Sequence, residues 1–179
     1  MTRYVALLRG INVGGKNVIK MTALKACFEG AGFDDVATFI QSGNVLFTAS
    51  GPAPALTKKI EAILGKAFNY QASVVLRSDK HLKETVKSAP KGFGSQPAKY
   101  RYDVIFLKEP LTASEAMQSV RTKPGIDTAH TGKGVLYFSR LISKASQSHL
   151  PRLMASPIYQ RLTIRNWNTT SKLLALLEA

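Results

Sequence analysis

The residues best suited to bind a ligand lie in a glycine-rich segment near the N-terminus, Gly10-Ile11-Asn12-Val13-Gly14-Gly15-Lys16-Asn17. The segment follows an apolar run and reads G-x-x-x-x-G-K, as in the first part of a nucleotide-binding P-loop. In that spacing, successive backbone N–H groups can surround a phosphate while the lysine supplies a compact positive charge. Asn17 stands where a P-loop has the Ser or Thr that holds Mg²⁺, so we exclude a conventional nucleotide hydrolase. Two interpretations stay open, an anion-binding loop and a structural glycine turn.

A second block with similar chemistry precedes the last expected helix, Arg165-Asn166-Trp167-Asn168-Thr169-Thr170-Ser171-Lys172. Helix N-termini attract anions through their exposed N–H groups and the helix dipole, and we expect Asn168 or Thr169 as the cap. Arg165 can hold a phosphate with two N–H groups, and Lys172 lies one turn into the helix. The alternative is a well-capped helix without a ligand. For Trp167 itself we expect a place in the core.

Residues typical of catalysis are sparse. Cys27 lies on the apolar face of an expected helix, which favours a buried, inert thiol over a nucleophile. The histidines show no metal-ligand spacing, and we predict no metal site and no cofactor. Asp34 and Asp35 are adjacent loop residues by their position after Gly32, and not an acid/base pair. The sequence leaves open whether the protein is an enzyme.

The hydrophobic pattern predicts an α+β fold of two subdomains. The first, residues 1–77, has the order strand, helix, strand, strand, helix, strand (βαββαβ), typical of a ferredoxin-like unit with an antiparallel sheet. Its strands are expected at 3–9, 36–40, 45–48 and 72–77, and its helices at 21–31 and 54–68. The second, residues 78–179, begins with a helix at 79–88 capped by Ser78 and a linker-like stretch at 89–100. Beyond it we expect strands at 102–108, 135–139 and 162–165, and helices at 112–121, 142–159 and 169–177.

The predicted topology brings two polar segments together. The first two strands of a βαββαβ unit run parallel, because a right-handed helical crossover joins them. The loop after the first strand and the turn Gln41-Ser42-Gly43-Asn44 after the second therefore lie at the same end of the sheet. We expect a ligand site here, built from Arg9, Asn12, Gly14, Gly15, Lys16, Asn17, Gln41, Ser42 and Asn44 and closed from the second subdomain by Arg165, Asn168 and Lys172.

The charge of the chain supports an anionic partner. Among its 179 residues, 25 Lys and Arg face 11 Asp and Glu, a formal net charge of +14. No acidic residue lies between Asp127 and Glu178, so this stretch presents positive potential to an outside anion or to another part of the molecule, unless it is only a solvated basic surface. The expected partner is a phosphate-bearing small molecule or a nucleic acid. The third strand, however, lacks the aromatic pattern with which a similar fold stacks RNA bases.

Several classes of protein are excluded. The apolar runs are too short for a membrane span or a signal-peptide core. Because Cys27 is the single cysteine, an internal disulfide framework is excluded as well. We therefore expect a cytoplasmic protein, and its oligomeric state stays open.

Three blocks of the sequence resemble the signature blocks of an uncharacterised bacterial family, domain of unknown function 1697: residues 6–17 with 19–21, residues 39–47, and residues 163–169 with Lys172. The resemblance implies two α+β subdomains, the first ferredoxin-like. It brings no established activity and no catalytic residues. It implies that the glycine loop, the Gln-Ser-Gly-Asn turn and the Arg-Asn-Trp-Asn block are the distinguishing positions of the family.

Three functions follow as hypotheses. The leading hypothesis is a binding protein for a phosphate-bearing ligand or nucleic acid. The second is an enzyme that uses the same loops to position a phosphorylated small substrate. The third is a structural or interaction protein in which the motifs only hold two subdomains together.

Overall fold

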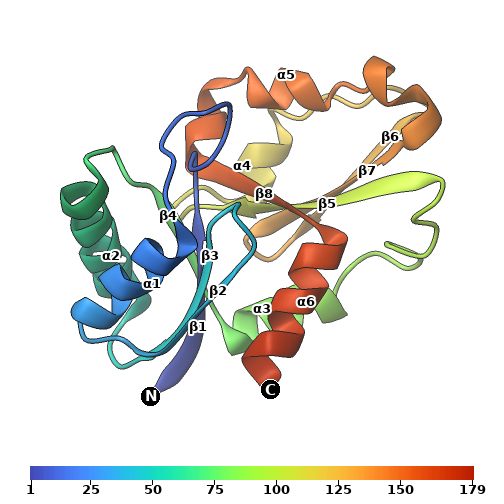
Figure 1. The fold of residues 1–179 in the computed structure, drawn as a ribbon. Helices are drawn as coiled ribbons and strands as arrows, with labels where there is room; N and C mark the ends of the chain where they lie inside the picture. Colours follow the sequence, from blue (N-terminus) through green and yellow to red (C-terminus); the bar gives the residue numbers. More distant parts are fainter. The chain divides into compact units, whose positions relative to one another are not determined.

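A computed structural model describes residues 1–179 and contains two four-stranded antiparallel sheets (Figure 1). Contacts divide the chain into an N-terminal unit, residues 1–82 with 173–179, and a C-terminal unit, residues 83–172. The predicted α+β class with two subdomains is thus confirmed. No helix combines the length and the apolar character that spanning a membrane requires.

The N-terminal unit contains the strands β1 (Thr2–Leu8), β2 (Asp34–Phe39), β3 (Asn44–Ala49) and β4 (Val74–Ser78), with the helices α1 (Met21–Gly30) and α2 (Ala53–Phe68). Its strands pair in the order β2-β3-β1-β4, and every neighbouring pair is antiparallel. Helix α3 (Asp79–Lys87) follows β4 and passes into the C-terminal unit.

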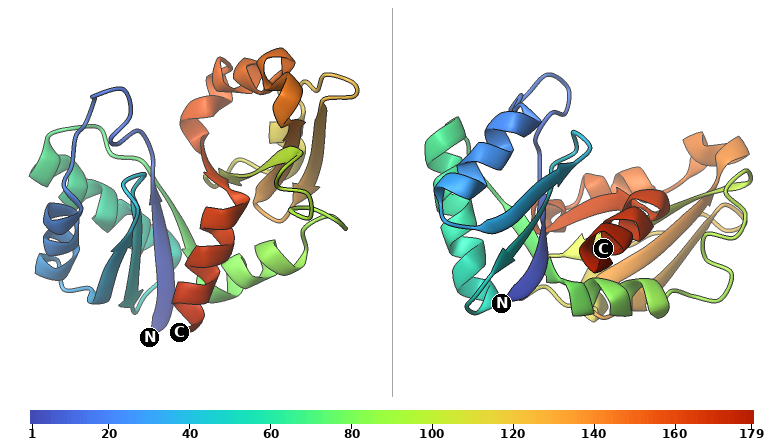
Figure 2. Two further views of the ribbon diagram at one scale, coloured as in Figure 1. Left: turned by 45° about the vertical axis from the view of Figure 1, so that its right-hand side comes forward. Right: turned by 60° about the horizontal axis from the view of Figure 1, so that its bottom comes forward.

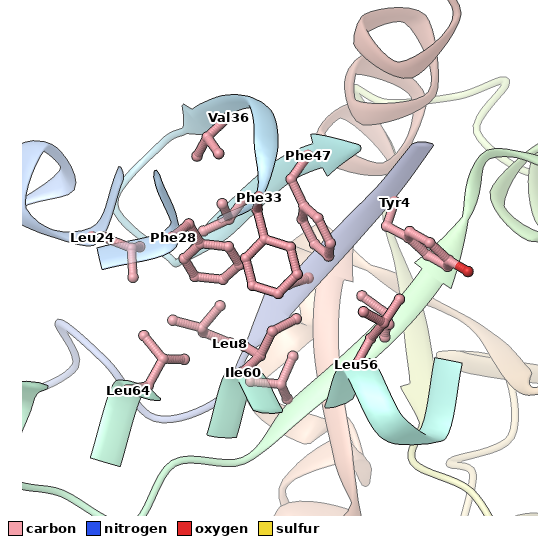
Figure 3. Close-up of a cluster of buried hydrophobic side chains, with 14 of the residues drawn as sticks. Tyr4, Leu8, Leu24, Phe28, Phe33, Val36, Phe47, Leu56, Ile60 and Leu64 are labelled. Carbon is pink, nitrogen blue, oxygen red and sulfur yellow. The ribbon is translucent and has the colours of Figure 1, made fainter. Parts of the chain in front are cut away.

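The core of the N-terminal unit lies between one face of the sheet and the helices α1 and α2 (Figure 3). Helix α2 buries Leu56, Ile60 and Leu64, which are four residues apart and so lie on one face. Phe28 of α1 and Phe47 of β3 meet with ring centroids 5.5 Å apart. Because the helices cover this face of the sheet, a ligand can reach the sheet at the ends of its strands and at their loops.

The end of the chain belongs to the N-terminal unit. Helix α6 (Trp167–Glu178) ends beside β1, so the two termini lie close together (Figure 2). The Arg3 guanidinium donates from Nη1 to the carbonyls of Leu177 at 2.6 Å and Ala179 at 2.7 Å. A cation at the C-terminus of a helix satisfies carbonyls that have no partner within the helix, and it interacts favourably with the helix dipole.

The C-terminal unit contains the strands β5 (Tyr100–Leu107), β6 (Asp127–Gly132), β7 (Val135–Leu141) and β8 (Leu162–Asn166). Its helices are α4 (Ala113–Met117) and α5 (Leu150–Met154), with the short 3₁₀ helices η1 (Ile142–Gln147) and η2 (Pro157–Arg161). The strands pair in the order β6-β7-β5-β8. Ile105, Phe138 and Leu162 of the sheet form its core with Ala116 of α4 and Leu153 of α5.

The two sheets have the same topology. In each unit the first strand is central, the second is an edge strand, and the fourth closes the opposite edge. In both units the last strand carries an arginine opposite a valine of the central strand, Arg77 opposite Val5 and Arg165 opposite Val104. The fold therefore contains an internal repeat, although the sequence shows no long repeat.

Three local predictions are wrong. Strand β6 was not expected, because its sequence Asp-Thr-Ala-His-Thr-Gly lacks an apolar alternation; as an edge strand it pairs only with β7. The helix expected at 142–159 is broken into η1, α5 and η2. Asp34 and Asp35 open strand β2 instead of lying in a loop, and Asp35 has φ +51° beside an irregularity in the pairing of β2 with β3.

Candidate functional site

The glycine loop and the Gln41–Asn44 turn meet at one end of the N-terminal sheet. Strands β1 and β2 are both antiparallel to β3 and so run parallel to each other. The Leu8 N–H donates to Gly43 O at 2.8 Å, and Asn12 Nδ2 donates to Gln41 O at 2.9 Å. We call residues 9–17 with 41–44 the glycine-loop cluster. The structure brings together all nine of the residues that the sequence placed there.

Asn12 holds the cluster together. Its Oδ1 accepts from the Ile19 N–H at 2.8 Å, and its Nδ2 donates to Ile19 O at 3.1 Å as well as to Gln41 O. Its backbone has φ +53°, a conformation that Asn tolerates better than most residues. Because both ends of the amide bind the protein itself, Asn12 shapes the loop.

The tip of the loop is a tight turn with a different shape from a P-loop. The Lys16 N–H donates to Val13 O at 3.0 Å, and Asn17 Nδ2 donates to Gly10 O at 2.9 Å. Gly14 and Gly15 both have positive φ, and both face open space. No helix follows directly, since α1 begins only at Met21. The geometry agrees with the exclusion of a conventional nucleotide hydrolase.

The Gln41–Asn44 turn is equally fixed. Asn44 is fully buried, and its Nδ2 donates to Phe39 O at 2.9 Å and to Ser42 Oγ at 3.1 Å. Gly43 has φ +87°, and a Cβ at this position would lie 2.6 Å from Cδ1 of the buried Ile11. Ile40 also has a positive φ, which is unusual for a β-branched residue. The turn therefore packs on the glycine loop and leaves no room for a side chain at residue 43.

The side chains of the cluster that face solvent are mostly basic or polar. Lys16, Gln41 and Ser42 are exposed, and Arg9 is half-buried. Exposed apolar side chains stand in the same segments, Val13 at 65%, Val18 at 74% and Ile40 at 48%. The segments 9–20 and 40–44 contain no acidic residue. The cluster thus presents a positive potential with an apolar margin.

The Arg165–Lys172 block belongs to the C-terminal unit. Arg165 is buried, and its Nη1 donates to Thr163 Oγ1 at 2.9 Å and to Ile164 O at 3.0 Å. Burial lowers the pKa of Arg165 to about 10, so its guanidinium is still charged at neutral pH. Asn168 and Lys172 are exposed. Closure of the site by these three residues stays a prediction.

The cap of α6 differs from the prediction. Asn166 is the cap, and its Oδ1 accepts from the Thr169 N–H at 2.7 Å. This is the usual bond from a capping side chain to the third residue of the helix, which begins at Trp167 and not at Thr169. Trp167 is half-buried and not part of the core. Its ring meets Phe93 edge-on, with centroids 5.1 Å apart and an interplanar angle of 89°.

Trp167 lines a pocket of about 170 Å³ that none of the sequence motifs indicates. The other lining residues are Gly94, Pro97, Tyr100, Arg101, Tyr102, Asn166 and Asn168. Two signals could have indicated it: the Tyr-Arg-Tyr pattern at 100–102 and the turn-rich segment before it. We call this set of residues the aromatic pocket.

Comparison with known proteins places these features in a family. The family described as "Protein of unknown function (DUF1697)" matches residues 1–137. The chain belongs to the DUF1697 family. Among solved structures, the conserved bacterial protein SP0830 from Streptococcus pneumoniae is 28% identical, with a TM-score of 0.88. That match covers 100% of this chain and 99% of that chain. No curated protein matches the sequence significantly.

The glycine loop and the Gln41–Asn44 turn lie inside the segment that matches DUF1697, and the Arg165–Lys172 block lies after it. The structural similarity to the streptococcal protein extends over all three. The fold common to both chains therefore includes the C-terminal helix.

The side chains of this DUF1697 protein that could take part in acid–base or metal chemistry do not form a cluster. No group of three or more His, Cys, Asp or Glu side chains is arranged to hold a metal ion. Burial raises the pKa of the Cys27 thiol. Burial also raises the pKa of Asp103, against the opposing effect of Arg140 and Arg101. Asp127 accepts hydrogen bonds from Ser148 Oγ at 2.6 Å and from the His149 N–H at 2.8 Å, so its carboxylate anchors the loop before α5.

Proposed function

We propose that the protein binds a phosphate-bearing ligand, a nucleic acid or a small phosphorylated molecule, through the glycine-loop cluster. One observation carries the proposal: two loops fixed against each other hold Lys16 and Arg9 at one end of a sheet, in segments without a carboxylate. A rigid cationic surface loses little conformational entropy when an anion binds. The strand order β4-β1-β3-β2 also supports a ferredoxin-like assignment for this unit.

The cluster residues divide into two roles under this proposal. Asn12, Asn17 and Asn44 use their amides to bind backbone carbonyls inside the cluster or directly beside it, and so they build it. The ligand contacts then come from Lys16, Arg9 and the exposed polar side chains of the turn. Lysine and arginine neutralise phosphates and release counterions, and the net charge of +14 strengthens the attraction at long range.

A hydrolytic or transfer reaction at the same cluster is the second candidate function. It is favoured by the exposed Ser42 hydroxyl, which accepts from Asn44 Nδ2 beside the cationic loop. An enzyme would also need a general base near this hydroxyl, and the residues of the cluster include no His, Asp or Glu. We therefore prefer binding to catalysis.

The test compares Lys16→Ala with Lys66→Ala, an exposed lysine in the last turn of α2 that removes the same charge elsewhere. Binding to duplex DNA is measured over a range of salt concentrations, and thermal shifts are measured with inorganic phosphate, sugar phosphates and nucleotides. We expect Lys16→Ala to weaken binding and to reduce the DNA salt slope by about 0.9, one phosphate contact. If both variants lose the same affinity, the effect comes from the net charge alone, and the proposal is contradicted.

A further inference from the structure

The aromatic pocket lies entirely within the C-terminal unit and is built by three segments. Gly94 and Pro97 come from the turns before β5, Tyr100 to Tyr102 from the start of β5, and Asn166 to Asn168 from the β8–α6 junction. Its volume of about 170 Å³ is below the range of pockets that hold whole drug-sized ligands. A pocket of this size suits a single flat ring system.

The walls of the pocket are fixed before any ligand arrives. Phe93 packs edge-on against Trp167 and against Tyr102, with centroids 5.1 Å and 4.9 Å away. Gly94, with φ +85°, lies directly on the indole edge, where a Cβ would overlap Trp167 Nε1. The Tyr102 hydroxyl accepts from the Gln96 N–H at 3.1 Å. The aromatic side chains therefore keep their positions without a ligand.

The chemistry of the lining matches a nucleobase. Tyr100, Tyr102 and Trp167 are half-buried, so each contributes aromatic surface to the pocket without being lost in the core. Base stacking on aromatic rings is tolerant of sequence, because every base has a π-face. The exposed amide of Asn168 supplies one donor and one acceptor group, the pairing that Asn offers to the edge of a base.

The rim of the pocket adds positive charge. Lys99 Nζ lies 5.4 Å from the centroid of the Tyr100 ring, and Arg101 is exposed beside it. Arginine can stack on a ring and bind a phosphate with the same planar group. The adjacent acid, Asp103, is buried with only 6% of its surface exposed. The rim can thus accept the phosphate attached to a base that lies in the pocket.

We infer that the aromatic pocket binds the nucleobase of a nucleotide, either free or within a single strand. The inference goes beyond the proposed function, because it assigns a second site, which lies within the C-terminal unit. It assigns the two parts of the ligand to different residues. Stacking belongs to Tyr100, Tyr102 and Trp167, and binding of the phosphate attached to the base belongs to Arg101 at the rim.

Trp167 is the single tryptophan of the chain and therefore reports directly on the pocket. Its fluorescence is followed while the full chain is titrated with adenosine, the four nucleoside monophosphates, ribose 5-phosphate and a short single-stranded oligonucleotide. We expect saturable quenching by every ligand that contains a base and none by ribose 5-phosphate. Tighter binding of the oligonucleotide than of the monophosphates identifies a strand as the source of the base, and the reverse identifies a free nucleotide.

The variants separate stacking from charge. Tyr100→Ala should weaken the quenching by base-containing ligands at least tenfold, and Tyr100→Phe, which keeps the ring, should restore it. Arg101→Ala should weaken the binding of nucleotides more than the binding of adenosine. The matched control is Arg152→Ala, which removes another exposed arginine of the same unit. A melting temperature measured for each variant confirms that the fold is intact.

Each failure has its own signature. Absence of quenching by every base-containing ligand, or quenching that Tyr100→Ala leaves unchanged, would overturn the inference. Equal quenching by ribose 5-phosphate and by the nucleotides would overturn it as well, while the proposed function stands. Quenching by adenosine that depends on Tyr100, together with no effect of Lys16→Ala on any phosphate ligand, supports the pocket and contradicts the proposed function.

Discussion

Gly43 and Ile11 lie so close that a Cβ on the glycine would come within 2.6 Å of the isoleucine Cδ1. This contact joins the turn after β2 to the loop after β1, and it depends on the absence of a side chain at residue 43. The Leu8 N–H bond to Gly43 O fixes the same point from the strand. The shape of the candidate site therefore depends on this pair as much as on any charged residue.

Gly43→Ala should destabilise the protein by about 2–5 kcal/mol. The left-handed backbone costs an alanine about 1–2 kcal/mol, and overpacking against Ile11 costs about 1–3 kcal/mol. Gly14→Ala is the matched control, because Gly14 has φ +57° in the same cluster but no atom within 4 Å of its Cβ position. Urea unfolding should show that the control loses only about 1 kcal/mol of unfolding free energy. Equal losses would mean that the Gly43–Ile11 contact contributes nothing.

Asn12→Ala should cost about 2 kcal/mol of unfolding free energy and also weaken ligand binding. The substitution removes the amide that accepts from the Ile19 N–H and donates to Ile19 O and Gln41 O, and each such bond contributes about 0.5–1.5 kcal/mol. Gln41→Ala is the control, because Gln41 receives its bond on the backbone carbonyl. Its stability should stay within about 0.5 kcal/mol of wild type. A stable Asn12→Ala variant that no longer binds would instead make Asn12 a direct ligand contact.

The meeting of the two polar loops could be predicted from sequence, and the roles of individual residues within them could not. The parallel arrangement of β1 and β2 follows from the order of elements, which hydrophobic periodicity shows. Whether the amide of Asn12 faces a ligand or a neighbouring carbonyl depends on its left-handed backbone, φ +53°, which no periodicity indicates. Strand β6 escaped prediction for a related reason, since an edge strand with polar residues has no apolar pattern.

The C-terminal block shows the same limit. The sequence places an arginine before a helix in both repeats, but no sequence pattern indicates that Arg77 and Arg165 are both buried. Trp167 was expected in the core because large aromatic residues are usually buried. In the structure Trp167 is half-buried, and its ring lies against Gly94, which is 73 residues away in the sequence. Such a contact between distant residues cannot be predicted from the local sequence pattern around Trp167.

Asn166→Ala should cost about 1 kcal/mol, because it removes the bond from the Asn166 side chain to the Thr169 N–H at the start of α6. Asn168→Ala, two residues further along, should leave stability within about 0.5 kcal/mol of wild type. The comparison uses thermal unfolding, where 1 kcal/mol corresponds to about 2–4 °C for a chain of this length. A larger loss of stability in Asn168→Ala than in Asn166→Ala would identify Asn168 as the cap.

Tyr137 should make stability depend on pH in the alkaline range. Its hydroxyl donates to Thr85 O at 2.7 Å, and burial, with a smaller effect of Glu84, raises its pKa from 10.0 to about 12. Between these values the unfolded chain loses the phenolic proton while the folded protein keeps it. The contribution of the neutral hydroxyl is therefore complete below pH 10 and is lost as the pH rises toward 12.

The test compares wild type with Tyr137→Phe by urea unfolding at pH 7, 9 and 11. At pH 7 the variant should be less stable by about 1 kcal/mol, because the hydrogen bond from the Tyr137 hydroxyl to Thr85 O is lost. At pH 11 the deficit should shrink, since only the wild type then pays for keeping its phenol protonated. Titration of the tyrosinate absorbance should in parallel show one group fewer in the variant at the high end of the curve. A deficit that is constant from pH 7 to 11 would show that the hydroxyl of Tyr137 ionises as readily in the folded protein as in the unfolded chain.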